Sequence, residues 1–230
     1  LSLVFNLGIS LVVGREEALE FLRGYLVEKS LAVDNLFVFV LIFSYFGVPS
    51  KYQHRVLFWG ILGALMMRAI FILAGSYVLQ RYSWVMYVFG ALLLVTGVRM
   101  AMRDDEGIDP EHSRVLQLTR KFLPVTVGFR GTHFFVRENG RTYATPLLLV
   151  LILIEVSDLV FAVDSIPAIF AITLDPFIVY TSNIFAILGL RSMFFLLAAV
   201  VERFYMLKYG LAVILTFIGV KMLIEKWYHI

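Results

Sequence analysis

The chain has 230 residues, of which 60% are hydrophobic and only 16% are charged, and its mean hydropathy is +0.87. Soluble domains are about 45–50% apolar, so this composition excludes an ordinary water-soluble globule. The absence of cysteine from these residues excludes disulfides, thiolate metal sites and cysteine chemistry within them. The formal net charge of +3 does not point to a nucleic-acid partner, because in a membrane protein the distribution of Lys and Arg matters more than their sum.

Apolar windows long enough to cross a bilayer, at about 18 residues or more, predict transmembrane helices. Six such windows cover residues 26–46, 55–79, 84–102, 147–171, 178–200 and 207–226. A seventh run, residues 1–13, is too short, and it lacks the basic start and cleavage site of a signal peptide. Because the chain also begins without Met and stops just after Trp227, we expect it to be a piece of a longer protein. The predicted fold class is all-α, a polytopic transmembrane helix bundle.

Three short sequence words recur in the same order along the chain. They are 32–35 and 162–165, 61–63 and 187–189, and 97–100 and 219–222, at spacings of 130, 126 and 122 residues. This order predicts duplication of a three-helix unit, and an odd number of crossings inverts the second copy in the membrane. The predicted regions are a partial N-terminal helix with a non-cytoplasmic connection (1–25), repeat one (26–102), a cytoplasmic linker with a short hairpin (103–146), repeat two (147–227) and the start of a further segment (228–230).

Basic residues predict the orientation of the bundle. Lys51, Arg55, the basic residues of the linker, Arg203 and Lys208 all fall on one side, which the positive-inside rule makes cytoplasmic. The linker opens with an acidic cluster at 104–111 next to His112, for which a solvated loop is favoured over a metal sensor. A basic amphipathic stretch follows at 116–122, and Asn-Gly at 139–140 predicts a small interfacial β-hairpin.

Acidic and amide side chains inside the apolar windows are the main functional signal, because charges in lipid-embedded helices are costly and mark sites or pathways. They concentrate in the first helix of each predicted repeat. When the two repeats are superimposed, Glu28 falls on Asp158, Asp34 on Asp164 and Asn35 on Ser165, while Glu155 has no acidic counterpart. We therefore predict a metal site drawn from these side chains: Glu28, Asp34, Asn35, Glu155, Asp158, Asp164 and Ser165.

The spacing of these groups conflicts with a straight helix. At about 100° per residue, Glu28 and Asn35 lie about 20° apart, but Asp34 lies about 120° from Glu28. Pro167 predicts that the first helix of the second repeat is broken or kinked near Asp164, where freed carbonyl oxygens could meet a cation. A dry kink without a ligand role is the alternative.

Two arginines, Arg68 and Arg191, also lie inside apolar windows and are possible charge partners of the acids. Buried ion pairs that only hold the bundle together are the competing interpretation, although five acids exceed two arginines. Every candidate donor is an oxygen, which suits Mg²⁺, Ca²⁺ or Mn²⁺. All four histidines fall in loops or near the chain end, so zinc and copper are disfavoured.

Long motifs give the sequence a family resemblance. Residues 28–35 (EKSLAVDN), 155–168 (EVSDLVFAVDSIPA) and 181–191 (TSNIFAILGLR), together with 134–140 (FFVRENG), resemble the TerC membrane family, and among its branches the Alx-type members. The resemblance implies a Mn²⁺ exporter of the bacterial inner membrane, and it places the family's acidic motif positions at Glu28, Asp34, Glu155, Asp158 and Asp164. Other TerC members are tied to metal efflux, metal delivery or tellurite resistance.

The sequence therefore predicts a multi-pass secondary transporter rather than an enzyme. Its cargo would be Mn²⁺, with other hard divalent cations and proton exchange left open, and it would have no organic cofactor. The direction of transport follows from the resemblance alone. The alternatives are a membrane scaffold or metallochaperone whose buried acids form structural ion pairs, and a membrane-bound redox enzyme, for which no cysteine, haem or nucleotide motif is found. The oligomeric state is open.

Overall fold

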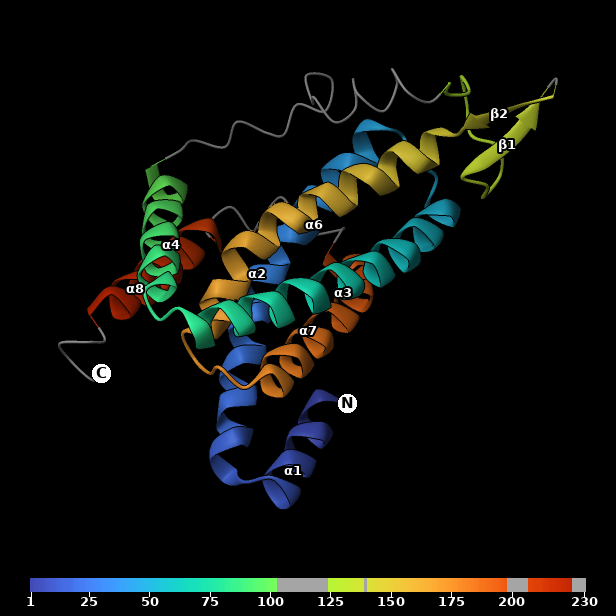
Figure 1. Ribbon diagram of the computed structural model, residues 1–230. Coiled ribbons are helices and arrows are strands. Elements are labelled where there is room, and N and C mark those ends of the chain that lie inside the picture. The colour runs from blue at the N-terminus through green and yellow to red at the C-terminus, as the bar shows by residue number, and fades with distance from the viewer. Residues whose placement is uncertain (103–123, 139, 198–206, 225–230) are drawn as a thin grey trace.

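The computed structural model describes residues 1–102, 124–138, 140–197 and 207–224 (Figure 1). The linker residues 103–123, Asn139 and the side chains of Asp34 and Arg191 lie outside the described part. The described elements are α1 (Ser2–Val12), α2 (Arg15–Tyr45), α3 (Ser50–Arg81), α4 (Val85–Met102), β1 (Phe135–Glu138), β2 (Arg141–Ala144), α6 (Pro146–Phe170), α7 (Pro176–Leu197) and α8 (Leu207–Ile224). The chain is thus mostly helical, as predicted.

Three of the described helices, α3, α4 and α6, are long and apolar enough to cross a membrane. The described parts of α7 and α8 contain shorter apolar runs, 176–190 and 212–224. Helix α2 is long enough, at 31 residues, but it carries the acidic and basic side chains that the sequence places there. Its start at Arg15 lies well before the apolar window at residue 26, because the charged first turns extend the helix beyond the apolar part.

Four helices, α2, α3, α6 and α7, form the central bundle, and α4 and α8 form a crossed pair beside it (Figure 1). The most extensive contacts between helices join α4 with α8, α2 with α7, and α3 with α6. Helices α2 and α6 run in opposite directions: Gly24 lies near Ile169, and Phe46 lines the same pocket as Leu149. The charged side chains of α2 and α6 therefore meet near the middle of both helices.

Glycine permits the close crossing of α4 and α8. A Cβ atom built on Gly97 would lie 2.9 Å from the carbonyl oxygen of Ala212, and one built on Gly219 would lie 2.6 Å from the backbone nitrogen of Leu94. Real Cβ contacts are not this short, so no larger residue fits at either position without a shift of backbone. Small residues at helix crossings are typical of membrane bundles, where packing rather than the hydrophobic effect joins the helices.

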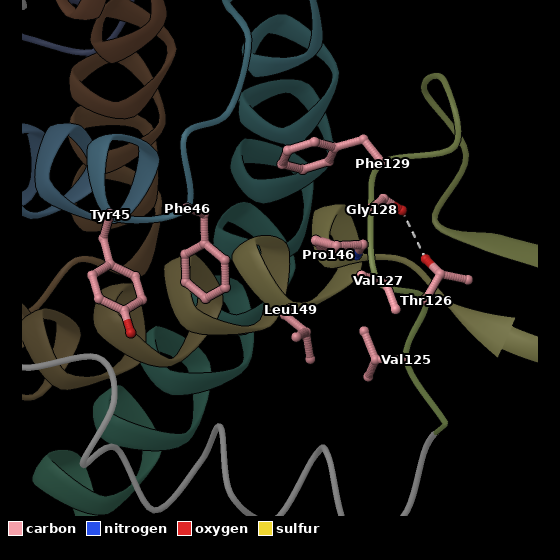
Figure 2. Close-up of a pocket in the computed structure, with 9 residues that line it drawn as sticks. All are labelled: Tyr45, Phe46, Val125, Thr126, Val127, Gly128, Phe129, Pro146 and Leu149. Atoms are coloured by element: carbon pink, nitrogen blue, oxygen red, sulfur yellow. Dashed lines mark hydrogen bonds between the residues drawn. The ribbon is translucent and has the colours of Figure 1, made fainter.

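The predicted hairpin is present. β1 and β2 pair antiparallel, with Val136 opposite Tyr143, and Gly140 in the turn has φ +78°, a conformation that favours glycine. A pocket of about 610 Å³ lies beside the hairpin and is lined by the C-terminal end of α2, the start of α6 and residues 125–129 (Figure 2). Arg55 of α3 also donates to the hydroxyl of Thr132, 2.9 Å away, so the hairpin segment is fastened to the helical bundle.

The predicted break in α6 is not found. The helix continues through Asp164 and Ser165 to Phe170, with Pro167 inside it. Proline removes only its own N–H, which would otherwise donate to the carbonyl oxygen of Val163, and the helix ends a few residues later at Phe170. Glu28 and Asp158 are brought together by contact between separate helices, and no unwound segment is required for this.

Candidate cation site

Arg68 is the centre of the polar cluster inside the bundle. Its side chain is 1% exposed, and it projects from α3 toward α2 and α6. Nη2 and Nε donate to the two carboxylate oxygens of Asp158 at 3.0 and 3.2 Å, and Nη1 donates to Oε1 of Glu28. Nη1 also lies 3.3 Å from the hydroxyl of Ser165. The planar guanidinium fork thus binds Asp158 through two bonds and Glu28 through one, the geometry in which arginine pairs most strongly with carboxylates.

The cluster depends on three helices whose sequences place a polar group at the same depth. Asp158 and Ser165 lie seven residues apart on α6, about 20° apart around the helix, so both face α3. Glu28 comes from α2, which runs opposite to α6. The sequence superposition had paired Glu28 with Asp158, and the structure joins both to one arginine.

The described cluster holds two carboxylates against one guanidinium. Glu28 and Asp158 are 1% and 2% exposed, so neither is solvated by bulk water. Moving a charged group from water into the interior of a protein costs free energy. The attraction between buried opposite charges offsets this cost only when every polar atom of the pair has a hydrogen-bond partner. One atom is not: Oε2 of Glu28 is buried without a hydrogen-bond partner. The cluster therefore retains a formal negative charge and an unused oxygen ligand.

Two other predicted acids, Glu155 and Asp164, do not join this cluster. The Glu155 side chain is partly buried against Gly63 of α3, with Oε2 unpartnered, and Asp164 accepts a 3.0 Å hydrogen bond from the hydroxyl of Thr96 on α4. Among the side chains that the structure describes, no three acidic or histidine residues lie close enough together to hold a metal. Asn35 is buried on α2. The side chains of Asp34 and Arg191 lie outside this description.

The sequence interpretation passed over two polar side chains, Lys29 of α2 and Asn183 of α7. Nζ of Lys29 donates to the carbonyl oxygen of Ala186 at 3.3 Å and lies against Gly189. Asn183 is 1% exposed, and both polar atoms of its amide lack a hydrogen-bond partner. The available signal was the same one that revealed the acids, a polar side chain inside an apolar window, here 26–46 for Lys29 and 178–200 for Asn183.

Chemically, the cluster presents oxygen atoms that a hard divalent cation also prefers. The guanidinium of Arg68 already contacts three of the four carboxylate oxygens of Glu28 and Asp158. A cation that bound both carboxylates at short metal–oxygen distances would have to displace Arg68 from at least one of them. The contacts are therefore either a permanent ion pair, or one state of a site at which Arg68 and a cation exchange.

These features define a polytopic α-helical membrane protein with an ionic cluster inside its bundle. The chain belongs to the integral membrane protein TerC family, whose pattern it matches over residues 13–230. It is similar over 220 residues, at 60% identity, to an Escherichia coli K12 protein named "Putative membrane-bound redox modulator Alx", covering 95% of this chain and 68% of that protein.

Two further relatives have names that state no activity. An uncharacterised membrane protein of Myxococcus xanthus is 57% identical over 224 residues, 97% of this chain and 70% of its own length. A Rickettsia bellii membrane protein is 47% identical over 227 residues, 99% of this chain and 75% of its own. No solved structure matches the chain. The family and its bacterial members place the chain in the bacterial inner membrane as a multi-pass protein.

Proposed function

We propose that this protein is a secondary transporter that exports Mn²⁺ across the bacterial inner membrane. One observation carries the proposal: two buried carboxylates from two different helices, Glu28 and Asp158, share a single guanidinium, and one of their oxygens has no partner. Ionisable groups at this depth in a membrane bundle are functional by default. Nothing in a purely structural ion pair requires the surplus charge.

The proposed exchange step is based on the contacts of Arg68. In the absence of metal, Arg68 acts as an internal cation that compensates one of the two carboxylate charges, because it already binds both groups. An arriving divalent cation takes over the carboxylate oxygens, and Arg68 withdraws. When the cation leaves toward the other side, Arg68 returns. This competition keeps the buried acids from remaining uncompensated at any stage, which would cost several kcal/mol.

Alternating access requires two halves that can rock against each other, and reciprocal contacts support two inverted halves. In the predicted repeat α2 corresponds to α6 and α3 to α7, and α2 packs against α7 as α6 packs against α3. A spacing of 122 residues likewise relates the contact of Gly97 with Thr216 to that of Gly219 with Leu94. Pairs exchanged in this way are expected of a two-fold axis between repeats.

Two arguments bear on the identity of the transported cation, and the second is more specific than the first. Oxygen donors favour a hard cation, which leaves Mn²⁺, Mg²⁺ and Ca²⁺. Manganese, and its outward direction, come from the family resemblance. Relatives carry the name redox modulator, but the 230 residues contain no cysteine for thiol redox chemistry. A redox effect of such proteins would then follow from the metal they move.

A membrane scaffold or metallochaperone is the second candidate function, and the Arg68 ion pairs favour it. In that case Glu28, Arg68 and Asp158 hold α2, α3 and α6 together permanently. The two functions differ in what the carboxylates do when metal is present. A scaffold leaves them paired with Arg68, whereas a transporter exchanges partners.

Flux of Mn²⁺ into proteoliposomes separates the two. The full-length protein is reconstituted with a manganese-quenched dye inside the vesicles, beside the variants Glu28→Gln and Asp158→Asn. Arg130→Ala is the matched control, because its ion pair with Glu138 is exposed and lies in the hairpin segment. We expect quenching with the natural protein and the control, and at least a tenfold slower rate with either carboxylate variant. No flux with the natural protein contradicts transport.

A further inference from the structure

Asn183 is a buried amide for which the fold provides no partner. The side chain is only 1% exposed, and neither the oxygen nor the nitrogen of its amide has a hydrogen-bond partner. Neighbouring polar residues of α7 differ: the Ser182 hydroxyl donates to the carbonyl oxygen of Val179 at 3.0 Å, and Thr181 donates to that of Phe177 at 2.7 Å. An unsatisfied buried polar group costs about 1–3 kcal/mol. Leucine would be the more stable choice at this position.

The register of α3 against α7 places this amide at the level of Arg68. Ile72 of α3 and Val179 of α7 belong to one hydrophobic cluster, while Leu57 and Ile187 belong to another, so the two helices run antiparallel. Arg68 lies one turn before Ile72, and Asn183 lies one turn after Val179. In antiparallel helices these two steps lead to the same depth. The buried Val179 and Ile187 also fix the face of α7 on which Asn183 lies, because residues four apart share a face.

The register of α2 against α7 leads to the same place from the other side. Gly24 lies beside Ser182, since a Cβ atom on it would be 3.1 Å from the Ser182 hydroxyl, and Lys29 donates to the Ala186 carbonyl oxygen. Glu28 lies between Gly24 and Lys29 on α2. It therefore stands opposite the turn of α7 that contains Asn183, and its own Oε2 is the unpartnered oxygen of the cluster.

We infer that Asn183 is a ligand of the transported cation, with its amide oxygen and Oε2 of Glu28 binding the same ion. The inference rests on the proposed function and extends it to a fourth helix of the bundle, α7. The Asn183 amide and Oε2 of Glu28 are both without a hydrogen-bond partner, lie at one depth, and are hard oxygen donors suited to a divalent cation. A neutral amide adds an oxygen ligand without adding charge, and so it leaves the balance between Arg68 and the two carboxylates unchanged.

Binding and stability measured together test this role. The full-length protein in detergent is titrated with Mn²⁺ alone, and free Mn²⁺ is followed by its solution EPR signal. The variants are Asn183→Leu, which removes the oxygen at similar size, and Asn183→Asp, which retains it. Ser182→Ala is the matched control on the same turn. Thermal unfolding of each variant without metal is recorded in parallel.

We expect Asn183→Leu to raise the dissociation constant for Mn²⁺ about tenfold or more, since even outer partners of metal ligands contribute about 10–100-fold in affinity. Its midpoint of unfolding without metal should not fall, because an unsatisfied amide is removed. Asn183→Asp and Ser182→Ala should retain binding. If Asn183→Leu binds Mn²⁺ like the natural protein, the inference is overturned and the proposed function stands. If the natural protein binds no Mn²⁺, the proposed function fails with it.

Discussion

Replacing Arg68 by methionine tests whether the guanidinium holds a place that a metal ion can take. The substitution keeps a long flexible side chain in α3 but removes all donors to Glu28 and Asp158, which are 1% and 2% exposed. Removing one partner of a buried ion pair destabilises a protein by about 3–5 kcal/mol, because the remaining charge is uncompensated. Here two carboxylates would remain without a counter-ion among the described residues of the cluster.

Metal should restore much of this loss. A ligand at a concentration 100 times its dissociation constant stabilises the folded state by about 2.7 kcal/mol. In the Arg68→Met variant Mn²⁺ no longer has to displace the guanidinium, so its affinity should increase and its stabilising effect should exceed that in the natural protein. The assay is thermal unfolding of purified full-length protein in detergent, with and without Mn²⁺, followed by intrinsic tryptophan fluorescence.

Arg130→Met is the matched control, because its ion pair with Glu138 is exposed and should contribute less than about 1 kcal/mol. We expect its unfolding midpoint to stay near that of the natural protein. An Arg68→Met variant that is destabilised but gains no more from Mn²⁺ than the natural protein would refute exchange at this site. A variant with unchanged stability would refute the ion pairs themselves.

Two other substitutions probe the packing around the site. Gly97→Leu should destabilise the protein by about 1–3 kcal/mol through overpacking, because a Cβ atom there would lie 2.7 Å from the backbone nitrogen of Thr216. Gly210→Leu is the control, because nothing lies within 4 Å of a Cβ atom at that position, and it should not destabilise the protein. Thermal unfolding compares the two variants. Thr96→Val should cost about 1.5–3 kcal/mol through the lost hydrogen bond to Asp164. That loss should disappear in an Asp164→Ala background, which removes the acceptor, and an equal loss in both backgrounds would contradict the bond.

The positions of most helices could be predicted, because the length and position of an apolar run determine where a helix can cross the membrane. The apolar window at 147–171 agrees with α6 to within one residue at each end, and Asn-Gly at 139–140 predicted the turn between β1 and β2. The start of α2 could not be found in this way, since Arg15 and Glu16 belong to a helix whose first turns are not apolar. Hydropathy detects the part of a helix that suits lipid, and hydrogen bonding determines where the helix begins.

Three predicted ligand residues, Glu28, Asp158 and Ser165, lie in the cluster with Arg68, but the way in which they come together was not predicted. Angles around a straight helix separated Asp34 from Glu28, and Pro167 predicted a break near Asp164 that would expose further ligands. The structure keeps α6 continuous and pairs Glu28 with Asp158 through Arg68, because neighbouring helices bring together groups that one helix separates. Which helices are neighbours depends on packing between residues far apart in sequence. A helical wheel contains no information about it.

The crossing of α4 and α8 illustrates the same difference. Gly97 and Gly219 were recognised as corresponding positions in the repeat, yet their physical role became clear only at the contact, where each lies against the backbone of the partner helix. Asn183, in contrast, was not among the predicted site residues. Its sequence segment contributed to the family resemblance, but only its burial without a partner distinguishes it from a polar residue that the helix itself satisfies.

Anomalous scattering at the manganese absorption edge, from crystals of the full-length protein grown with Mn²⁺, tests the central claim most directly. We predict an anomalous peak within bonding distance of Glu28, with Arg68 withdrawn from at least one of the carboxylates that it binds in this structure. A map in which Arg68 still binds both Glu28 and Asp158, and in which manganese appears only at the protein surface, would contradict it.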